Sequence, residues 1–128
     1  MWTLDKVLRS PQMNRVANLP CEVSVILYVT PERIRALKTY DKVGTEKAVE
    51  VPDINDVIKG CKKNRTNKVI LVHNHPPING VSDASPSEDD MIATTKFESE
   101  LRKLGVILLD HIIVSPKNYF SFKANDLI

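Results

Sequence analysis

The sequence predicts one α/β domain in which a mixed β-sheet is flanked by helices, and three observations support this. Runs of apolar, β-branched and aromatic residues recur at 22–30, 68–74 and 106–114, as in buried strands. Segments with helical signals lie between these runs. The length of 128 residues suits one domain, and a composition of 42% hydrophobic and 27% charged residues is that of a folded globular protein.

Residues 1–20 are predicted to form an arm or a short helix that leads into a domain spanning residues 21–128. The apolar residues of this segment have partial helical spacing, and Pro11 and Pro20 interrupt it.

The first half of the domain is predicted to begin with strands. The run at 22–30 is apolar almost throughout, which indicates a central strand. Residues 34–43 and 47–51 are the next two predicted strands, joined by a turn at 41–45.

A helix is expected from Asp53 to about Asn64. Asp53 is a favourable N-cap, and apolar residues follow it in the first turn. The run at 68–74 is expected to be a short buried strand, and its Pro, Gly, Ser and Asn content marks the segment 75–85 as a loop.

A second helix is expected to begin near Pro86 and to end at Gly105. The helical spacing of its apolar residues predicts a face towards the core made of Met91, Ala93, Phe97, Leu101 and Leu104.

The chain is expected to close with a β-hairpin. Residues 106–114 are its first strand, residues 116–118 its turn, and the alternating segment 119–123 its second strand.

Hydropathy predicts no membrane span, and the charge is too balanced to favour nucleic acid or an anionic membrane surface as a partner. The formal net charge is +2, from 18 basic and 16 acidic residues, and no apolar run is long enough to cross a bilayer. The N-terminus has no signal-peptide core, so a cytoplasmic location is expected. A local basic cluster is interpreted as a solvated helix end, with weak phosphate contact as the alternative; it consists of Lys59, Lys62, Lys63, Arg65 and Lys68.

The two cysteines, Cys21 and Cys61, belong to no CxxC pair and so predict no cysteine zinc site. One disulfide is the alternative to the simpler interpretation, two reduced and buried thiols.

Two of the three histidines, His73 and His75, stand at the end of a predicted strand with Asn74 between them. Side chains at i and i+2 of a strand project to the same face, so both imidazoles can bind one metal ion while Asn74 points away. The alternative is a pair of histidines at a loop with ordinary hydrogen bonds.

Asp90 lies one turn into the second predicted helix, where its carboxylate can face the same strand end. Two histidines, an aspartate and an open position for water form the pattern of a catalytic zinc site. Ser87 and Asp90 also form a near capping box, and the two interpretations are compatible.

Glu22 stands at the edge of the first apolar strand, where a carboxylate needs a partner or solvent. Near a zinc-bound water it would serve as general base, and the alternative is a solvated glutamate. His111 lies inside the apolar strand 106–114; it could support the site, although a satisfied core or edge histidine is the favoured interpretation.

Together these motifs resemble the RadC-like branch of the JAB/MPN metalloprotease family. The chain carries VHNHP, then PSEDD, then LGVILLDHIIVSPKNYFSF, and the likeness covers roughly residues 20–123. The JAMM signature of that family is an upstream glutamate, HxH and Ser-x-x-Asp, and it maps onto Glu22, His73, His75, Ser87 and Asp90.

The resemblance implies a JAB/MPN fold related to that of cytidine deaminases, a Zn²⁺ cofactor, and hydrolysis of a peptide or isopeptide bond. The implied substrate is a peptide or a ubiquitin-like protein, and Ser87 would help to hold the tetrahedral oxyanion. Members named RadC carry a DNA-repair label, so the alternative is a DNA-repair or mobile-element accessory protein acting on or near nucleic acid. A non-catalytic interaction module is a third interpretation, which the full ligand set disfavours; exposed edge strands could also support an oligomer.

The loop after His75 departs from the family's pattern. Residues 76–86 separate His75 from Ser87, about four more than the family usually has. A loop absorbs such an insertion at small entropic cost. Because it borders the open metal position, we expect it to affect substrate access.

Overall fold

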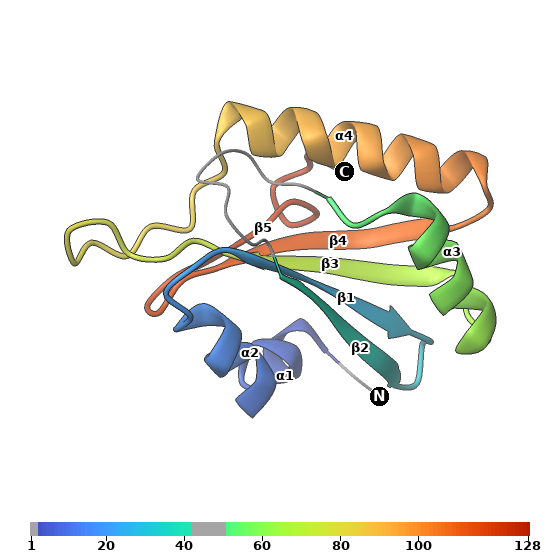
Figure 1. Ribbon diagram of the computed structural model, residues 1–128, viewed down its shortest axis with the longest axis horizontal. Helices are drawn as coiled ribbons and strands as arrows, with labels where there is room; N and C mark the ends of the chain where they lie inside the picture. The colour runs from blue at the N-terminus through green and yellow to red at the C-terminus, as the bar shows by residue number, and fades with distance from the viewer. Residues whose placement is uncertain (1–2, 42–50) are drawn as a thin grey trace.

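A five-stranded mixed β-sheet forms the centre of the protein (Figure 1), which the computed structural model describes over residues 3–41 and 51–128. The strand order is β2-β1-β3-β4-β5, and only β3 and β4 run parallel. The strands are β1 (Val23–Val29), β2 (Ile34–Asp41), β3 (Lys68–Asn74), β4 (Ile107–Val114) and β5 (Tyr119–Ser121). The predicted fold class, a mixed sheet flanked by helices, is confirmed.

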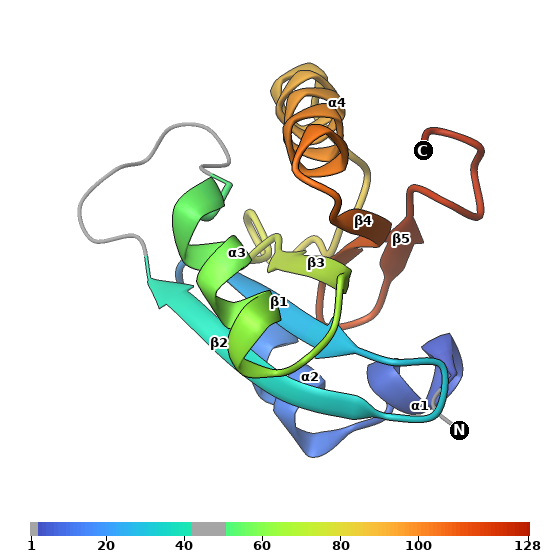
Figure 2. The same cartoon turned by 90° about the vertical axis from the view of Figure 1, so that its right-hand side faces the viewer.

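Helices cover both faces of the sheet, as Figures 1 and 2 show. The short helices α1 (Leu4–Leu8) and α2 (Pro11–Ala17) lie on one face. The longer helices α3 (Ile54–Lys63) and α4 (Glu88–Lys103) lie on the other. Within the described residues, no helix is both long and apolar enough to span a membrane.

Strand β1 is buried along its whole length and lies between β2 and β3, so the predicted central strand is confirmed. Its side chains alternate between the two cores, as the pleat of a strand requires. Val25 and Leu27 pack towards α1 and α2, whereas Ile26 and Tyr28 pack towards α3 and α4.

The pairing of β3 with β4 contains an irregularity. Val69 pairs with Leu108, but the next residue, Ile70, pairs with Asp110, so Leu109 is left without a partner in the ladder. This β-bulge shifts the alternation of β4 by one residue.

The first predicted helix and the strand after it are confirmed. Asp53 caps α3 by accepting a hydrogen bond from the Asp56 N–H, and Asn64 is the C-cap. Strand β3 has the predicted bounds. Most of the predicted turn at 41–45 and strand at 47–51 lies outside the described residues.

The predicted apolar face of α4 is partly wrong. Met91 and Leu104 are 40% and 58% exposed. The buried side chains are those of Asp90, Thr94, Phe97 and Leu101, which follow one another at helical spacing. Polar residues occupy the first turns of this face because they belong to the site rather than to the apolar core.

Two further expectations need correction. Strand β5 ends at Ser121 rather than at Lys123, whose N–H is bonded to Asp110 Oδ1 at 3.0 Å instead of continuing the ladder. Both cysteines are free thiols, as expected, but only Cys61 is buried and Cys21 is exposed.

Candidate metal centre

The two histidines of the HNH tripeptide converge at the end of β3. His73 is buried, and its Nε2 lies 3.1 Å from Nε2 of His75. His75 follows the strand and is held by a 2.8 Å bond from its N–H to the carbonyl of Val114. The predicted convergence of the two imidazoles is therefore present.

Asp90 joins the histidines from the first turn of α4. A full capping box fixes this turn: Asp90 N–H donates to Ser87 Oγ at 3.0 Å, and Ser87 N–H donates to Asp90 Oδ2 at 2.8 Å. Asp90 Oδ2 lies 3.2 Å from His75 Nε2, and Oδ1 lies 3.7 Å from His73 Nε2.

The Asp90 carboxylate is incompletely satisfied. It is 1% exposed, and its Oδ1 has no hydrogen-bond partner among the described residues. A buried charged oxygen without a partner is costly unless a proton or a cation meets it. Ligand atoms of a tetrahedral zinc ion, with bonds of about 2.0–2.1 Å, lie about 3.3 Å apart. The spacings within the group formed by His73, His75 and Asp90 are close to this value.

Glu22 lies at the rim of the same cluster. Its Oε1 is 3.9 Å from His75 Nε2, and its side chain is 38% exposed. One carboxylate oxygen of Glu22 and one ring nitrogen from each of His73 and His75 lie within 4.8 Å of one another, a group that could bind a metal ion. Asp90 is nearer to both imidazoles and is buried, whereas Glu22 is set back towards solvent.

Asn74 has a role that sequence reasoning missed. Its side chain points away from the histidines, as predicted, and is fully buried. It accepts a bond from the Val23 N–H at 2.7 Å and donates to the Cys21 carbonyl at 2.9 Å. The backbone is thereby held on both sides of Glu22.

Charge coupling within the cluster is strong. Burial alone would raise the pKa of Asp90, but bonds from His75 and the Ser87 N–H and the charges of both histidines lower it to about 2. Burial acts to lower the pKa of His75, while Asp90, Glu22 and a bond to the Asp83 backbone raise it by more. The cluster therefore favours an ionised carboxylate beside two imidazoles.

His111 also belongs to the site, through His73. It is a buried and satisfied histidine, as favoured from the sequence, because its ring nitrogens contact Thr94 Oγ1 and His73 Nδ1, each at 2.6 Å. Burial holds the pKa of His111 well below its ordinary value. Spacing along β4 could not reveal this contact, because the β-bulge at Leu109 turns His111 towards α4.

A cleft of about 550 Å³ opens above the cluster. Glu22, His75 and Asp90 line one side, together with Ser87. The loop 76–86 also lines the cleft, through residues that include Pro76, Pro77, Ile78 and Val81.

The tip of this loop is a tight hairpin. Ile78 and Val81 pair across Asn79 and Gly80, whose φ angles are +52° and +76°. Positive φ at both central residues is typical of a type I′ turn, for which Asn-Gly is the preferred pair. The tip of the lengthened loop is therefore a defined turn, from which Ile78 and Val81 line the cleft.

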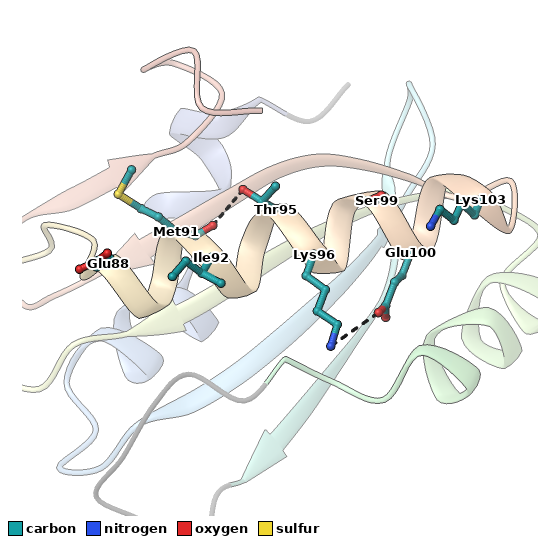
Figure 3. Close-up of a pocket in the computed structure, with 8 residues that line it drawn as sticks. All are labelled: Glu88, Met91, Ile92, Thr95, Lys96, Ser99, Glu100 and Lys103. Carbon is teal, nitrogen blue, oxygen red and sulfur yellow. Dashed lines mark hydrogen bonds and ion pairs between the residues drawn. The ribbon is translucent and has the colours of Figure 1, made fainter.

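A larger hollow, of about 740 Å³, lies on the outer face of α4 (Figure 3). Its lining includes the exposed Met91 and Ile92 and the ion pair between Lys96 and Glu100. It contains neither histidine nor cysteine, so the smaller cleft above the cluster is the better candidate for chemistry.

Comparison with known proteins gives one family. The family model described as RadC-like JAB domain matches residues 5–127. The chain is 34% identical over 130 residues to a UPF0758 protein of Streptococcus pyogenes serotype M49 (strain NZ131), covering 97% of this chain and 55% of that protein. It is 30% identical over 94 residues to a UPF0758 protein of Streptococcus suis (strain 98HAH33), covering 68% of this chain and 37% of that protein. The chain thus spans about half the length, or less, of these curated relatives.

Proposed function

Because this chain belongs to the RadC-like JAB domain family, we propose that it is a zinc-dependent hydrolase that cleaves a peptide or isopeptide bond. The observation that carries the proposal is the buried Asp90 Oδ1, which has no hydrogen-bond partner among the described residues, lies 3.7 Å from His73 Nε2, and belongs to a residue that lines the cleft. A metal ion held by His73, His75 and Asp90 would satisfy this oxygen and leave a position open to the cleft.

The donor atoms support zinc as the proposed metal. Two imidazole nitrogens and one carboxylate oxygen are typical of catalytic zinc, whereas magnesium and calcium prefer oxygen donors alone. When bound, zinc supplies Lewis acidity: it lowers the pKa of a coordinated water and polarises the substrate carbonyl.

Glu22 is proposed as the general base. Its carboxylate is set back from the ligands, 3.9 Å from His75 Nε2, and is partly exposed to the cleft. From there it can accept a proton from water and return it to the leaving nitrogen.

Ser87 is proposed to stabilise the oxyanion. Its Oγ accepts the capping bond from the Asp90 N–H, so the hydroxyl proton stays available to a group in the cleft. A donor aimed at developing negative charge lowers the barrier of acyl transfer.

Three variants test the assignment. Zinc content and zinc affinity are measured for Asp90→Asn, for its neighbour Asp89→Asn as matched control, and for Glu22→Gln. We expect Asp90→Asn to bind zinc at least about 100-fold more weakly, since even outer partners of a metal contribute 10–100-fold. Asp89→Asn should bind as wild type, because Asp89 also lines the cleft but is exposed.

The Glu22→Gln variant distinguishes the proposed role of Glu22, general base, from that of Asp90, metal ligand. It should keep its zinc and lose hydrolysis of a peptide library, followed by mass spectrometry. If Glu22→Gln loses zinc while Asp90→Asn keeps it, Glu22 is a ligand and the assignment is wrong. Zinc-loaded wild-type protein that cleaves neither the library nor a ubiquitin-like fusion would remove the hydrolase proposal.

A second candidate function is contact with a nucleic-acid backbone, favoured by one observation. The basic cluster at the C-terminal end of α3 lies beside Arg33 and Arg35 at the start of β2, and these two arginines line a hollow of about 360 Å³ together with Lys63 and Arg65. In the described part of the chain, none of these four side chains forms an ion pair.

Salt dependence tests this candidate. Four phosphate contacts would weaken DNA binding roughly 100-fold between 50 and 200 mM salt. Fluorescence anisotropy with a labelled duplex should show this slope for wild type and a shallower one for Arg35→Glu. Lack of binding at 50 mM salt would exclude the candidate.

A further inference from the structure

His111 connects His73 of the metal cluster to Thr94 of α4. Its Nε2 lies 2.6 Å from His73 Nδ1, and its Nδ1 lies 2.6 Å from Thr94 Oγ1. Its ring stacks on Phe122 with centroids 4.5 Å apart and planes 12° from parallel. Both ring nitrogens therefore have a hydrogen-bond partner, and within the described residues neither partner is a carboxylate.

The direction of these bonds follows from counting protons. Thr94 has one hydroxyl proton, and its Oγ1 donates to the Asp90 carbonyl at 2.7 Å, which can only accept. Thr94 Oγ1 must then accept its second bond from His111 Nδ1–H. A fully buried imidazole with no carboxylate partner is neutral and carries one proton, so His111 Nε2 is an acceptor.

The remaining bond then has one direction. His73 donates its Nδ1–H to His111 Nε2, so in the neutral ring, which is the form that binds a metal, the lone pair of His73 lies on Nε2. That atom lies 3.1 Å from His75 Nε2 and 3.7 Å from Asp90 Oδ1. The lone pair is thus presented to the centre of the proposed ligand set.

We infer that Thr94 and His111 are positioning residues that set the tautomer and ring orientation of His73, and thereby the metal affinity of the site. This inference rests on the proposed function, because the metal whose affinity it concerns is the proposed zinc ion. A metal-bound histidine usually donates its other N–H to a carboxylate, a carbonyl or water. Here a second histidine is the acceptor, and it is held by the helix that also supplies Asp90.

The tautomer can be read directly by nuclear magnetic resonance of the protein with ¹⁵N-labelled histidine. The chain has three histidines, so the His75→Gln and His111→Gln variants assign the signals by elimination. We expect His73 to carry a proton on Nδ1 both without metal and with zinc, and none on Nε2 when zinc is bound. A His73 Nδ1 without a proton in the metal-free protein would mean that the bonds run the opposite way, and would overturn the inference.

Zinc affinity supplies the second readout, by competition with a chromophoric chelator. Thr94→Val, which keeps the shape and removes the hydroxyl, and His111→Leu should each bind zinc roughly 10–100-fold more weakly. Thr94→Ser keeps the hydroxyl and should bind within about threefold of wild type. Phe122→Leu is the packing control, since it disturbs the stacked ring without removing a hydrogen bond; it should lower stability and leave affinity unchanged.

The two proposals fail in different ways. Folded Thr94→Val and His111→Leu proteins with wild-type zinc affinity would overturn the positioning role while leaving the metal site intact. Wild-type protein that binds no zinc would overturn the metal site, and the nitrogen spectrum of the metal-free protein would still decide the direction of the bonds.

Discussion

Asn74 and Val23 are joined by a 2.7 Å hydrogen bond from the backbone N–H of Val23 to Asn74 Oδ1. With the bond from Asn74 Nδ2 to the Cys21 carbonyl, it fixes the start of β1 against the end of β3. One tripeptide therefore presents two imidazoles on one face of the sheet and, from the other face, holds the backbone that carries Glu22.

Replacing Asn74 with leucine tests this link. The Val23 N–H would lose its partner inside the protein, so we expect the free energy of unfolding to fall by about 1–3 kcal/mol. Hydrolysis should fall further than zinc content, because Glu22 shifts while the ligands stay. Urea unfolding and zinc analysis measure the two effects, and Asn74→Asp, which keeps the acceptor, should lie between leucine and wild type. Wild-type stability and turnover in the leucine variant would contradict the role.

Zinc should stabilise the fold. The ion would satisfy the buried Asp90 Oδ1, which only the folded chain places beside His73. At 100 times the dissociation constant, a ligand that binds only the native state adds about 2.7 kcal/mol, which corresponds to roughly 10 °C in Tm. Differential scanning calorimetry should show the rise and its reversal by a chelator. The same rise in Asp90→Ala would mean that zinc binds elsewhere.

Acid should weaken a second polar cluster, formed by residues of β2 and α3. Asp56 on α3 bonds to Lys38 Nζ at 2.7 Å and to the Tyr40 hydroxyl, and these bonds lower its pKa below 3.8. A carboxyl with a lowered pKa in the folded state contributes stability above its unfolded pKa, and loses it as pH falls through the folded value.

The matched comparison is wild type against Asp56→Asn. The stability difference in urea unfolding should be present at pH 7 and should shrink progressively below about pH 4. A difference that stays constant down to the acid transition would show that the charge of Asp56 contributes nothing.

The hairpin of the added loop should affect substrate binding rather than metal binding. Ile78 and Val81 are 76% and 65% exposed and line the same cleft as Asp90. Ile78→Ser with Val81→Ser should raise KM roughly tenfold if apolar substrate groups pack there, since small apolar contacts contribute 1–3 kcal/mol to discrimination. Zinc affinity should not change. KM is measured by initial-rate kinetics on the peptide from the library that is cleaved fastest. An unchanged KM would show that Ile78 and Val81 do not contribute to substrate binding.

Much of the fold could be predicted because its signals are local. Apolar runs and N-caps located β1, β3 and α3, and the spacing of His73 and His75 placed both imidazoles on one face. The polar residues Asp90 and Thr94 broke the apolar pattern of α4, so its buried face was partly misjudged.

Contacts between distant segments could not be predicted in the same way. Asn74 holds the backbone at Cys21 and Val23, and nothing in its neighbours in sequence indicates this. The contact of His111 with His73 depends on which residue of β4 lies opposite which residue of β3. Register is a property of two strands together, so the pattern of either strand alone does not contain it.

Because Leu109 has no partner in the ladder, the number of residues between Leu108 and His111 decides which face of the sheet His111 occupies. Leu108 faces α3 and α4, and strict alternation would turn His111, three positions later, to the opposite face. The extra residue reverses this, so His111 pairs with Leu71 and reaches His73. A chain shorter by this one residue could keep its hydrophobic composition and its strands and still separate the metal cluster from the helix that supports it.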